Sequence, residues 1–328
     1  MSTIIIPGAQ KSGTTALFER VISHESVIHP KKKETHFFSQ DEKVISNHRT
    51  WYNNEVKMND KRHSIDASTS YLRDKHAAKK VKEHLPDPKV LIVLRDPVQR
   101  AYSGYLQMRK KVPTVEGRKF SDIINTIYNR VNRSSEVDAK SITKFEKEII
   151  KESKKVDKNY ITNNYTDAPF DYNFEDMCWP YTYLRNSMYH NDIMKYKKVL
   201  DKEKVMILFF EHLVAKPEKY LSRVFRFLEL DQNDKKLILP KKNKTKLPSG
   251  KLSRWILNIK DIIKPGISFL DSLLPLTIYE KLRKSRTLFI SDKPKLRNDI
   301  GSKTRTLLSG EYSKMSTHYD TVESIWRY

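Results

Sequence analysis

Short apolar runs separated by amphipathic stretches dominate the first two thirds of the chain. Residues 3–7 read TIIIP, residues 89–94 read KVLIVL, and residues 204–210 read KVMILFF. A short apolar run bounded by charged residues, proline or glycine is typical of a strand that is buried on both faces. The segment HSIDASTSYL contains a further short run, which predicts a strand ending near Asp66.

Amphipathic stretches follow these runs and predict helices. One helix is expected over residues 14–22, and another is expected after residue 94, with Asp96 as its N-cap and Pro97 at its first position. Residues 183–200 have an amphipathic pattern, and a further helix is expected to open at Pro217. The alternation of strand and helix predicts an α/β fold with a mostly parallel sheet covered by helices on both faces.

Two segments depart from this alternation. Residues 109–176 are polar and rich in Lys and Asn, with one helix predicted near 143–155, as in a lid or a substrate-contacting insertion. The basic stretch after Leu237 leads to an amphipathic helix near 254–264, which either packs on its own domain or makes peripheral membrane contact. We therefore expect one domain over residues 1–328, with a core of 1–108 and 177–232, an insertion of about 109–176, and a basic helical C-terminal segment of 237–328.

Composition adds information about charge and compartment. The chain has 63 Lys and Arg against 40 Asp and Glu, a net charge of +23. This basic protein should attract anions, whether nucleic acid, acidic glycan, nucleotide or lipid, although a surface that only solubilises is the alternative. Cys178 is the single cysteine, so no intrachain disulfide forms and a reducing compartment is indicated. No apolar run approaches the ~18 residues of a membrane span, and Met1 leads directly into the first strand, so we expect a cytoplasmic protein without a signal peptide.

The stretch PGAQKSGTTAL, residues 7–17, joins the first strand to the first helix and carries the clearest candidate chemistry. Gly8 and Gly13 have the spacing of the loop G-x-x-x-x-G-K-[ST], whose backbone N–H groups hold phosphate at a helix N-terminus. Thr14 stands where that pattern requires lysine, and the loop's lysine, Lys11, lies three residues earlier. The displaced charge indicates one phosphate joined to one further anionic group. A glycine turn that binds nothing is the alternative.

A second candidate anion site follows the strand 89–94. Arg95 leaves the C-terminal end of this strand, where open α/β sheets bind ligands. Asp96, Arg100 and Ser103 share one face of the helix that follows. Arg95 and Ser103 can hold a second phosphate, although Arg100 can also simply pair with Asp96. Two such sites suggest a nucleotide that carries phosphates at both ends.

These motifs resemble those of sulfotransferases that use 3′-phosphoadenosine 5′-phosphosulfate (PAPS). PGAQKSGTTAL resembles the 5′-phosphosulfate loop, and RDPVQRAYSGY resembles the 3′-phosphate motif. KKKETHFFS is similar to the K-E-x-H-F-F segment of heparan sulfate and related carbohydrate sulfotransferases, and residues 187–230 look like the family's later helix, strand and helix. The resemblance implies a P-loop-like fold, adenosine 3′,5′-bisphosphate as product, and a carbohydrate or other hydroxyl-bearing or amine acceptor. It implies no metal and no nucleic-acid partner.

The resemblance also implies which residues bind the donor. Lys11 is assigned to the bridging oxygen, where charge develops as the adenosine bisphosphate leaves. The residues around the 5′-phosphate are Gln10, Ser12, Gly13, Thr14 and Thr15. The residues at the 3′-phosphate are Arg95 and Ser103, together with Ser249, Gly250 and Lys251 of a weaker match, PSGKLSR.

An acceptor hydroxyl needs a base, and the resemblance points to Glu34. His36 lies two residues on, so in an extended segment both side chains project the same way, and His36 can orient the acceptor or stabilise the transferring sulfuryl group. The alternatives are a salt bridge between Glu34 and one of the lysines at 31–33, and a packing role for His36.

Two of the departures from the family's pattern bear on the acceptor, while Ser187 replaces a glycine that is common before the tyrosine matching Tyr189. Ser39 and Ala67 stand where glycosaminoglycan enzymes usually carry an acidic residue and a lysine that hold the sulfated sugar chain, which argues against a heparan-like acceptor. Two rival functions stay open. A nucleoside triphosphate-dependent kinase predicts lysine at position 14 and an acidic Mg²⁺ site, whereas a non-catalytic polyanion-binding protein needs only the basic charge.

Overall fold

The structure is a computed structural model, and not every part of the chain can be described in it. The described residues are 2–58, 62–110, 116–133, 138–156, 168–172, 179–231, 247–248, 290–291 and 294–326. Ser249, Gly250, Lys251, Cys178 and the amphipathic helix expected near 254–264 lie outside the described residues.

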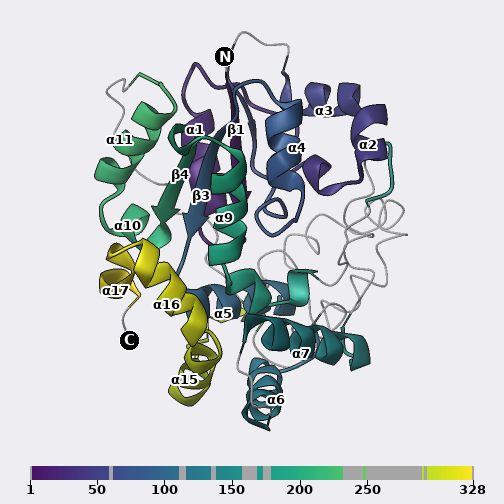
Figure 1. Ribbon diagram of the computed structural model, residues 1–328, viewed down its shortest axis with the longest axis vertical. Coiled ribbons are helices and arrows are strands. Elements are labelled where there is room, and N and C mark those ends of the chain that lie inside the picture. The colour runs from purple at the N-terminus through teal and green to yellow at the C-terminus, as the bar shows by residue number, and fades with distance from the viewer. Residues whose placement is uncertain are drawn as a thin grey trace, which may run out of the picture.

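A four-stranded parallel sheet lies at the centre of the molecule (Figure 1). Its order is β2-β1-β3-β4, with Ile5 of β1 opposite Val90 of β3, and Ile92 of β3 opposite Ile207 of β4. Because the strands are parallel, their C-terminal ends meet at one edge of the sheet. The strands are β1 (Thr3–Gly8), β2 (Ser64–Asp66), β3 (Lys89–Leu94) and β4 (Val205–Phe209). A separate antiparallel pair joins β5 (Leu247–Pro248) to β6 (Ile290–Ser291).

Helices cover both faces of this sheet, as predicted. Ile4 and Ile6 of β1 pack with α1 (Thr14–Ile22) and α11 (Pro217–Phe227) on one face. Ile5 packs with α4 (Ala77–His84) and α9 (His190–Val199) on the other. Successive strand side chains point to opposite faces, so the fully apolar runs are explained by burial on both sides. The predicted α/β class is confirmed.

The remaining helices lie around the sheet. α5 follows β3 and α10 follows β4. The last three helices, α15 to α17, lie on the side of the molecule where these two strands end (Figure 1). The α-helices are α2 (Glu42–Asn47), α3 (Arg49–Val56), α5 (Pro97–Arg109), α6 (Phe120–Arg133), α7 (Ala139–Glu152), α10 (Phe210–Ala215), α15 (Asn298–Leu307), α16 (Ser309–His318) and α17 (Thr321–Ile325). The 3₁₀ turns are η1 (Phe37–Ser39), η2 (Trp179–Tyr181), η3 (Arg185–Ser187) and η4 (Lys202–Lys204).

Two helix predictions were wrong in extent. The described residues of the insertion form two helices, α6 and α7, where one was expected, because the apolar residues of α6 stand at helical spacing among Asn and Arg. The helix predicted over 183–200 begins only at His190. Its first part is held in 3₁₀ geometry by side chains from other elements, which sequence periodicity does not report.

Two buried carboxylates hold this segment. Glu146 of α7 accepts the backbone N–H groups of Leu184 (2.8 Å) and Arg185 (2.9 Å). Glu311 of α16 accepts those of Tyr189 and His190, both at 2.7 Å, and so caps α9. Burial raises the pKa of both carboxyls to about 7. One carboxylate from the insertion and one from the C-terminal helices thus bind the segment that leads into α9.

The raised pKa values predict that stability falls as pH rises. Between about pH 4.5 and pH 7 the unfolded chain has released these two protons while the folded protein retains them, so alkali favours unfolding. We expect the variant Glu146→Gln/Glu311→Gln to lose less unfolding free energy than the wild type between pH 5 and about 7.5, measured by urea denaturation. Glu83→Gln, on the exposed face of α4, is the control, and an unchanged pH dependence in the double variant would contradict the assignment.

Candidate functional site

The loop between β1 and α1 has the geometry of an anion cradle. Gly13 is the residue before α1 and has φ 91° and ψ 12°, and no side chain among the described residues caps this helix end. A Cβ atom on Gly13 would lie 2.6 Å from Cδ2 of Phe210, so only glycine fits both the backbone and the space. The uncapped N–H groups and the helix dipole favour an anion here.

Buried hydroxyls lie beside this helix end. Ser12 and Thr14 are buried, whereas Gln10, Lys11, Gly13 and Thr15 are partly exposed. The Ser12 hydroxyl has no hydrogen-bond partner within the described part of the chain. A buried hydroxyl left unpaired costs about 1–3 kcal/mol, so a bound phosphate oxygen would offset a real penalty. The six predicted loop residues therefore lie together and fit a phosphate group.

Arg95 brings the second predicted anion element to this loop. Its Nη1 donates to the backbone oxygen of Lys11 at 3.1 Å, and its guanidinium lies 5.0 Å from the centroid of the Phe210 ring that also covers Gly13. Ser103 is buried further along α5. A pocket of about 470 Å³, lined by Arg95 and Phe210, lies where β3 and β4 end. This is where ligands bind in open α/β sheets.

Arg100 does not make the side-chain pair with Asp96 that the sequence left open as an alternative. It is fully buried, its Nε donates to Ser187 Oγ at 2.7 Å, and its Nη2 donates to the Tyr183 carbonyl at 2.6 Å. Asp96 instead caps α5 by accepting the Gln99 N–H at 2.8 Å. Arg100 thus fixes α5 against the segment before α9.

The C-terminal helices brace Arg95, which sequence reasoning missed. The Tyr312 hydroxyl donates to Asp96 Oδ2 at 2.7 Å, and the Tyr189 hydroxyl donates to the Arg95 carbonyl at 2.9 Å. Glu211 Oε1 accepts the Asp96 N–H at 2.9 Å, and Glu211 Oε2 accepts the indole N–H of Trp326 at 3.1 Å. No local motif marks these residues, because they meet only through the fold.

Glu34 lies beside the C-terminal end of β2, the strand next to β1. Its Oε2 accepts the Thr69 hydroxyl at 3.0 Å, and its Oε1 accepts Lys33 Nζ at 2.5 Å, so the salt bridge weighed from the sequence is formed. A Cβ atom on Gly8 would lie 3.6 Å from the Thr69 carbonyl oxygen, which places this turn against the start of the phosphate loop. The Glu34 side chain keeps 29% of its surface exposed.

The charge state of Glu34 suits a base. Burial alone would raise its pKa, but the Lys33 ammonium and His36, together with the hydrogen bonds from Lys33 and Thr69, lower the pKa below its usual value. Glu34 is therefore ionised at neutral pH. An ionised, part-exposed carboxylate beside an anion cradle can accept a proton from a bound hydroxyl or amine.

His36 is fully buried next to Glu34. Its Nε2 lies 3.5 Å from Glu34 Oε2, and its Nδ1 lies 2.7 Å from Ser70 Oγ. The backbone at His36 is left-handed, with φ 53° and ψ 18°, so the extended segment expected there is wrong, although the two side chains still meet. Burial lowers the pKa of His36 to about 4, against the effect of Glu34. The imidazole is therefore neutral at physiological pH.

A second buried carboxylate fixes the segment that carries Glu34 and His36. Asp66 accepts hydroxyl hydrogen bonds from Thr35 (2.6 Å), Ser68 (2.5 Å) and Tyr71 (2.8 Å). Ser39 and Ala67, the two departures from the family's pattern that bear on the acceptor, are buried in the same region. Neither position offers a charge to an acceptor. Charge for an anionic acceptor would have to come from other residues.

The described residues contain neither a metal-ion site nor a membrane-spanning helix. In them, no three His, Cys, Asp or Glu side chains lie close enough to hold a metal ion. No helix among these residues combines the length and apolarity that crossing a membrane requires.

The family model and the relatives that this chain resembles all point to the same family. Residues 2–247 match the family model described as the sulfotransferase domain. Heparan sulfate glucosamine 3-O-sulfotransferase 5 of Mus musculus is 26% identical over 69% of this chain and 53% of its own length. Heparan sulfate glucosamine 3-O-sulfotransferase 3B1 of Homo sapiens is 32% identical over 36% of this chain and 30% of its own length. The membrane-associated sulfotransferase kil1 of Dictyostelium discoideum is 21% identical over 71% of this chain and 57% of its own length.

The chain thus spans between 30% and 57% of the length of these three relatives. Among solved structures, the sulfotransferase from Alicyclobacillus acidocaldarius aligns with a TM-score of 0.48 at 19% identity, over 83% of this chain and 95% of that one. The family model covers most of the chain, including the Lys11 loop, Glu34 and the Arg95 motif. The chain therefore belongs to the sulfotransferase domain family.

Proposed function

We propose that the protein transfers a sulfuryl group from PAPS to a hydroxyl or amine of a carbohydrate. The observation that carries this proposal is the hydrogen bond from Arg95 to the backbone of Lys11, which brings two anion-binding elements together. A donor with a phosphosulfate at one end and a 3′-phosphate at the other fits two such elements at adjacent strand ends. The carbohydrate acceptor rests on the K-E-x-H-F-F segment and on the names of the relatives.

The residues present fit such a donor. The Gly13 cradle, the unpaired Ser12 hydroxyl and the uncapped N-terminus of α1 would hold the 5′-phosphate, and Arg95 and Ser103 would hold the 3′-phosphate. Their hydrogen bonds would orient the donor for displacement in line with the acceptor, which is where most of the rate enhancement of such transfers arises.

The chemical step needs one base and one cation. Glu34 takes the proton from the acceptor while the acceptor oxygen or nitrogen forms a bond to sulfur. The bond from sulfur to the bridging oxygen breaks, and its electron pair stays on the departing adenosine bisphosphate. Lys11 stabilises the charge that develops on that oxygen. Neutral His36 positions Glu34 without adding a competing charge.

Removing the donor-binding cations should separate binding from turnover. In Arg95→Ala we expect the affinity for adenosine 3′,5′-bisphosphate to fall about 10–100-fold, because a charge-assisted hydrogen bond is lost. Lys11→Ala should lower kcat more than it lowers this affinity, because its charge acts on the leaving group. Isothermal titration calorimetry and single-turnover kinetics measure the two effects. Lys198→Ala, on the exposed face of α9, is the control. Stabilisation of the wild type by ATP–Mg²⁺ but not by the bisphosphate would favour a kinase instead.

Replacing the base should affect turnover alone. We expect Glu34→Gln to lower kcat about 10²–10⁴-fold while the affinity for adenosine bisphosphate changes little, because the carboxylate acts on the acceptor proton. Glu83→Gln, on the exposed face of α4, serves as the matched control. Full sulfuryl transfer by Glu34→Gln would show that another group is the base.

The burial of His36 can be tested without a substrate. We expect its imidazole to stay neutral from pH 8 to about pH 5, because its pKa is lowered to about 4, whereas an unperturbed histidine titrates near pH 6.5. NMR chemical shifts of the ring, assigned by comparison with His36→Gln, follow the titration. A midpoint near neutrality would mean that His36 carries a charge during the reaction.

A further inference from the structure

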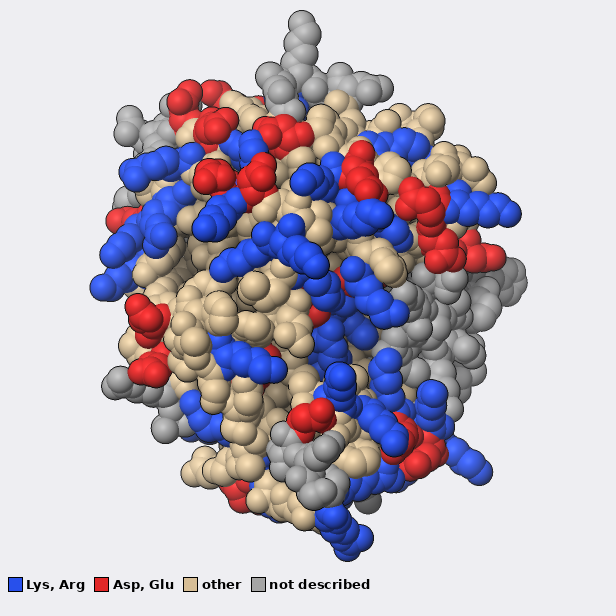
Figure 2. Space-filling view, in the orientation of Figure 1, with Lys and Arg blue, Asp and Glu red and all other residues tan. Residues whose placement is uncertain are grey.

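A basic groove of about 540 Å³ lies between α7, the residues just before and at the start of α9, and α16. The cations that line it from α7 and α16 are Lys140, Lys144, Lys147, Lys151 and Lys314. Figure 2 shows Lys and Arg side chains gathered on this face of the molecule, over the position that α7 has in Figure 1. None of these residues takes part in the candidate active site described above.

The four lysines of α7 form a regular array. Their spacing of four, three and four residues places them on one face of the helix, along about 16 Å of its axis. Ile142 and Ile150, on the other face, are buried in the core and fix the orientation of the helix, so the lysines stay on the outer face. An array of this length suits an extended anion with repeated charges better than a single phosphate.

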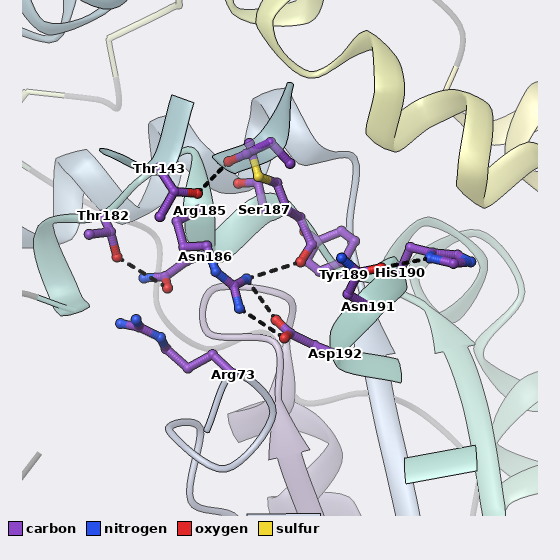
Figure 3. A network of polar contacts seen from close by, with 12 residues as sticks. Arg73, Thr143, Thr182, Arg185, Asn186, Ser187, Tyr189, His190, Asn191 and Asp192 are labelled. Atoms are coloured by element: carbon purple, nitrogen blue, oxygen red, sulfur yellow. Dashed lines mark hydrogen bonds and ion pairs between the residues drawn. The ribbon is translucent and has the colours of Figure 1, made fainter. Parts of the chain in front are cut away.

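The acidic side chains in and beside the groove already have partners, and they are fewer than the cations that line it. Asp192 accepts both terminal nitrogens of Arg185, at 2.8 and 2.9 Å, as Figure 3 shows. Glu311 is buried and accepts two backbone N–H groups. Glu148 accepts Arg130 at 3.3 Å and lies 4.0 Å from Lys144. The groove therefore keeps a strong excess of positive charge.

Neutral polar side chains also line the groove. Thr143 and Asn191 line it, and Figure 3 shows both near the Arg185–Asp192 pair. Among the described residues that line the groove none is aromatic, whereas single-stranded nucleic acid is usually held by aromatic stacking. The lysines surround a hollow and carry no projecting apolar anchors of the kind that hold a helix on a membrane.

We propose that this groove binds a linear anionic polysaccharide. Sulfate or carboxylate groups spaced along the sugar chain would meet successive lysines of α7, with Lys314 on the opposite wall. Each exposed pair contributes at most about 1 kcal/mol, so affinity comes from several pairs acting together and weakens as salt rises.

One contact links the groove's border to α5, the helix that carries Ser103 of the proposed donor site. Arg185 and Met188 line it and flank Ser187, whose hydroxyl accepts Arg100 of α5. As a docking site for the acceptor chain the groove rests on the proposed function, whereas its binding of polysaccharide does not. It would supply the charges that Ser39 and Ala67 lack.

Charge reversal tests the groove. We expect Lys140→Glu/Lys144→Glu to bind a fluorescent heparin-derived oligosaccharide about tenfold or more weakly than the wild type at about 0.1 M salt, measured by anisotropy. Lys198→Glu/Lys202→Glu makes the same change in net charge towards the other end of α9 and should change the affinity by less than about twofold. Lys314→Glu should weaken binding as well, because it lies on the opposite wall.

Equal losses in the two double variants would overturn the proposal, because attraction would then come from the overall charge. Tighter binding of duplex DNA or of anionic lipid vesicles through Lys140 and Lys144 would also overturn it. Adenosine 3′,5′-bisphosphate binding by the same variants distinguishes the two proposals. If the wild type fails to bind the bisphosphate, the proposed function fails while the result for the groove stands.

Discussion

The hydrogen bond between the Arg95 guanidinium and the Lys11 carbonyl organises the candidate site, because it connects the turn after β1 to the turn after β3. These strands are neighbours in a parallel sheet, so their ends meet without any further device. The ring of Phe210, from the end of β4, covers both Gly13 and Arg95. Three strand ends thus form one candidate anion-binding surface, and Glu34 lies beside it, next to β2.

Distant parts of the chain keep that surface rigid. Tyr312, Trp326 and Glu211 hold the backbone around Asp96, while Arg100 and Ser187 hold α5 against the segment that leads into α9. Preorganised groups cost no reorganisation when charge develops, so such bracing would favour the sulfuryl transfer proposed above.

Much of the fold could be predicted from the sequence. The apolar runs form strands, of which β1 and β3 are buried throughout and β4 only at its end. α1 spans 14–22, and Asp96 and Pro97 begin α5, because helix starts depend on local residues. The helical pattern of α6 was missed because its apolar residues stand among Asn and Arg, whereas the late start of α9 could not be predicted because long-range contacts override the local pattern there. For the site, the loop and Arg95 are close together as expected, whereas their bracing by Tyr312 has no local signal.

The family model ends at residue 247, yet Glu311, Tyr312 and Trp326 lie beyond it and contact the core directly. A recombinant fragment cut at that boundary would keep the loop of residues 7–17 and Arg95, and would still lose the helices whose side chains hold the Arg95 turn in place. Fragments designed for expression, chimeras or crystallisation should therefore retain α15 to α17, because these helices make hydrogen bonds to the core. The end of the family match is not a suitable boundary.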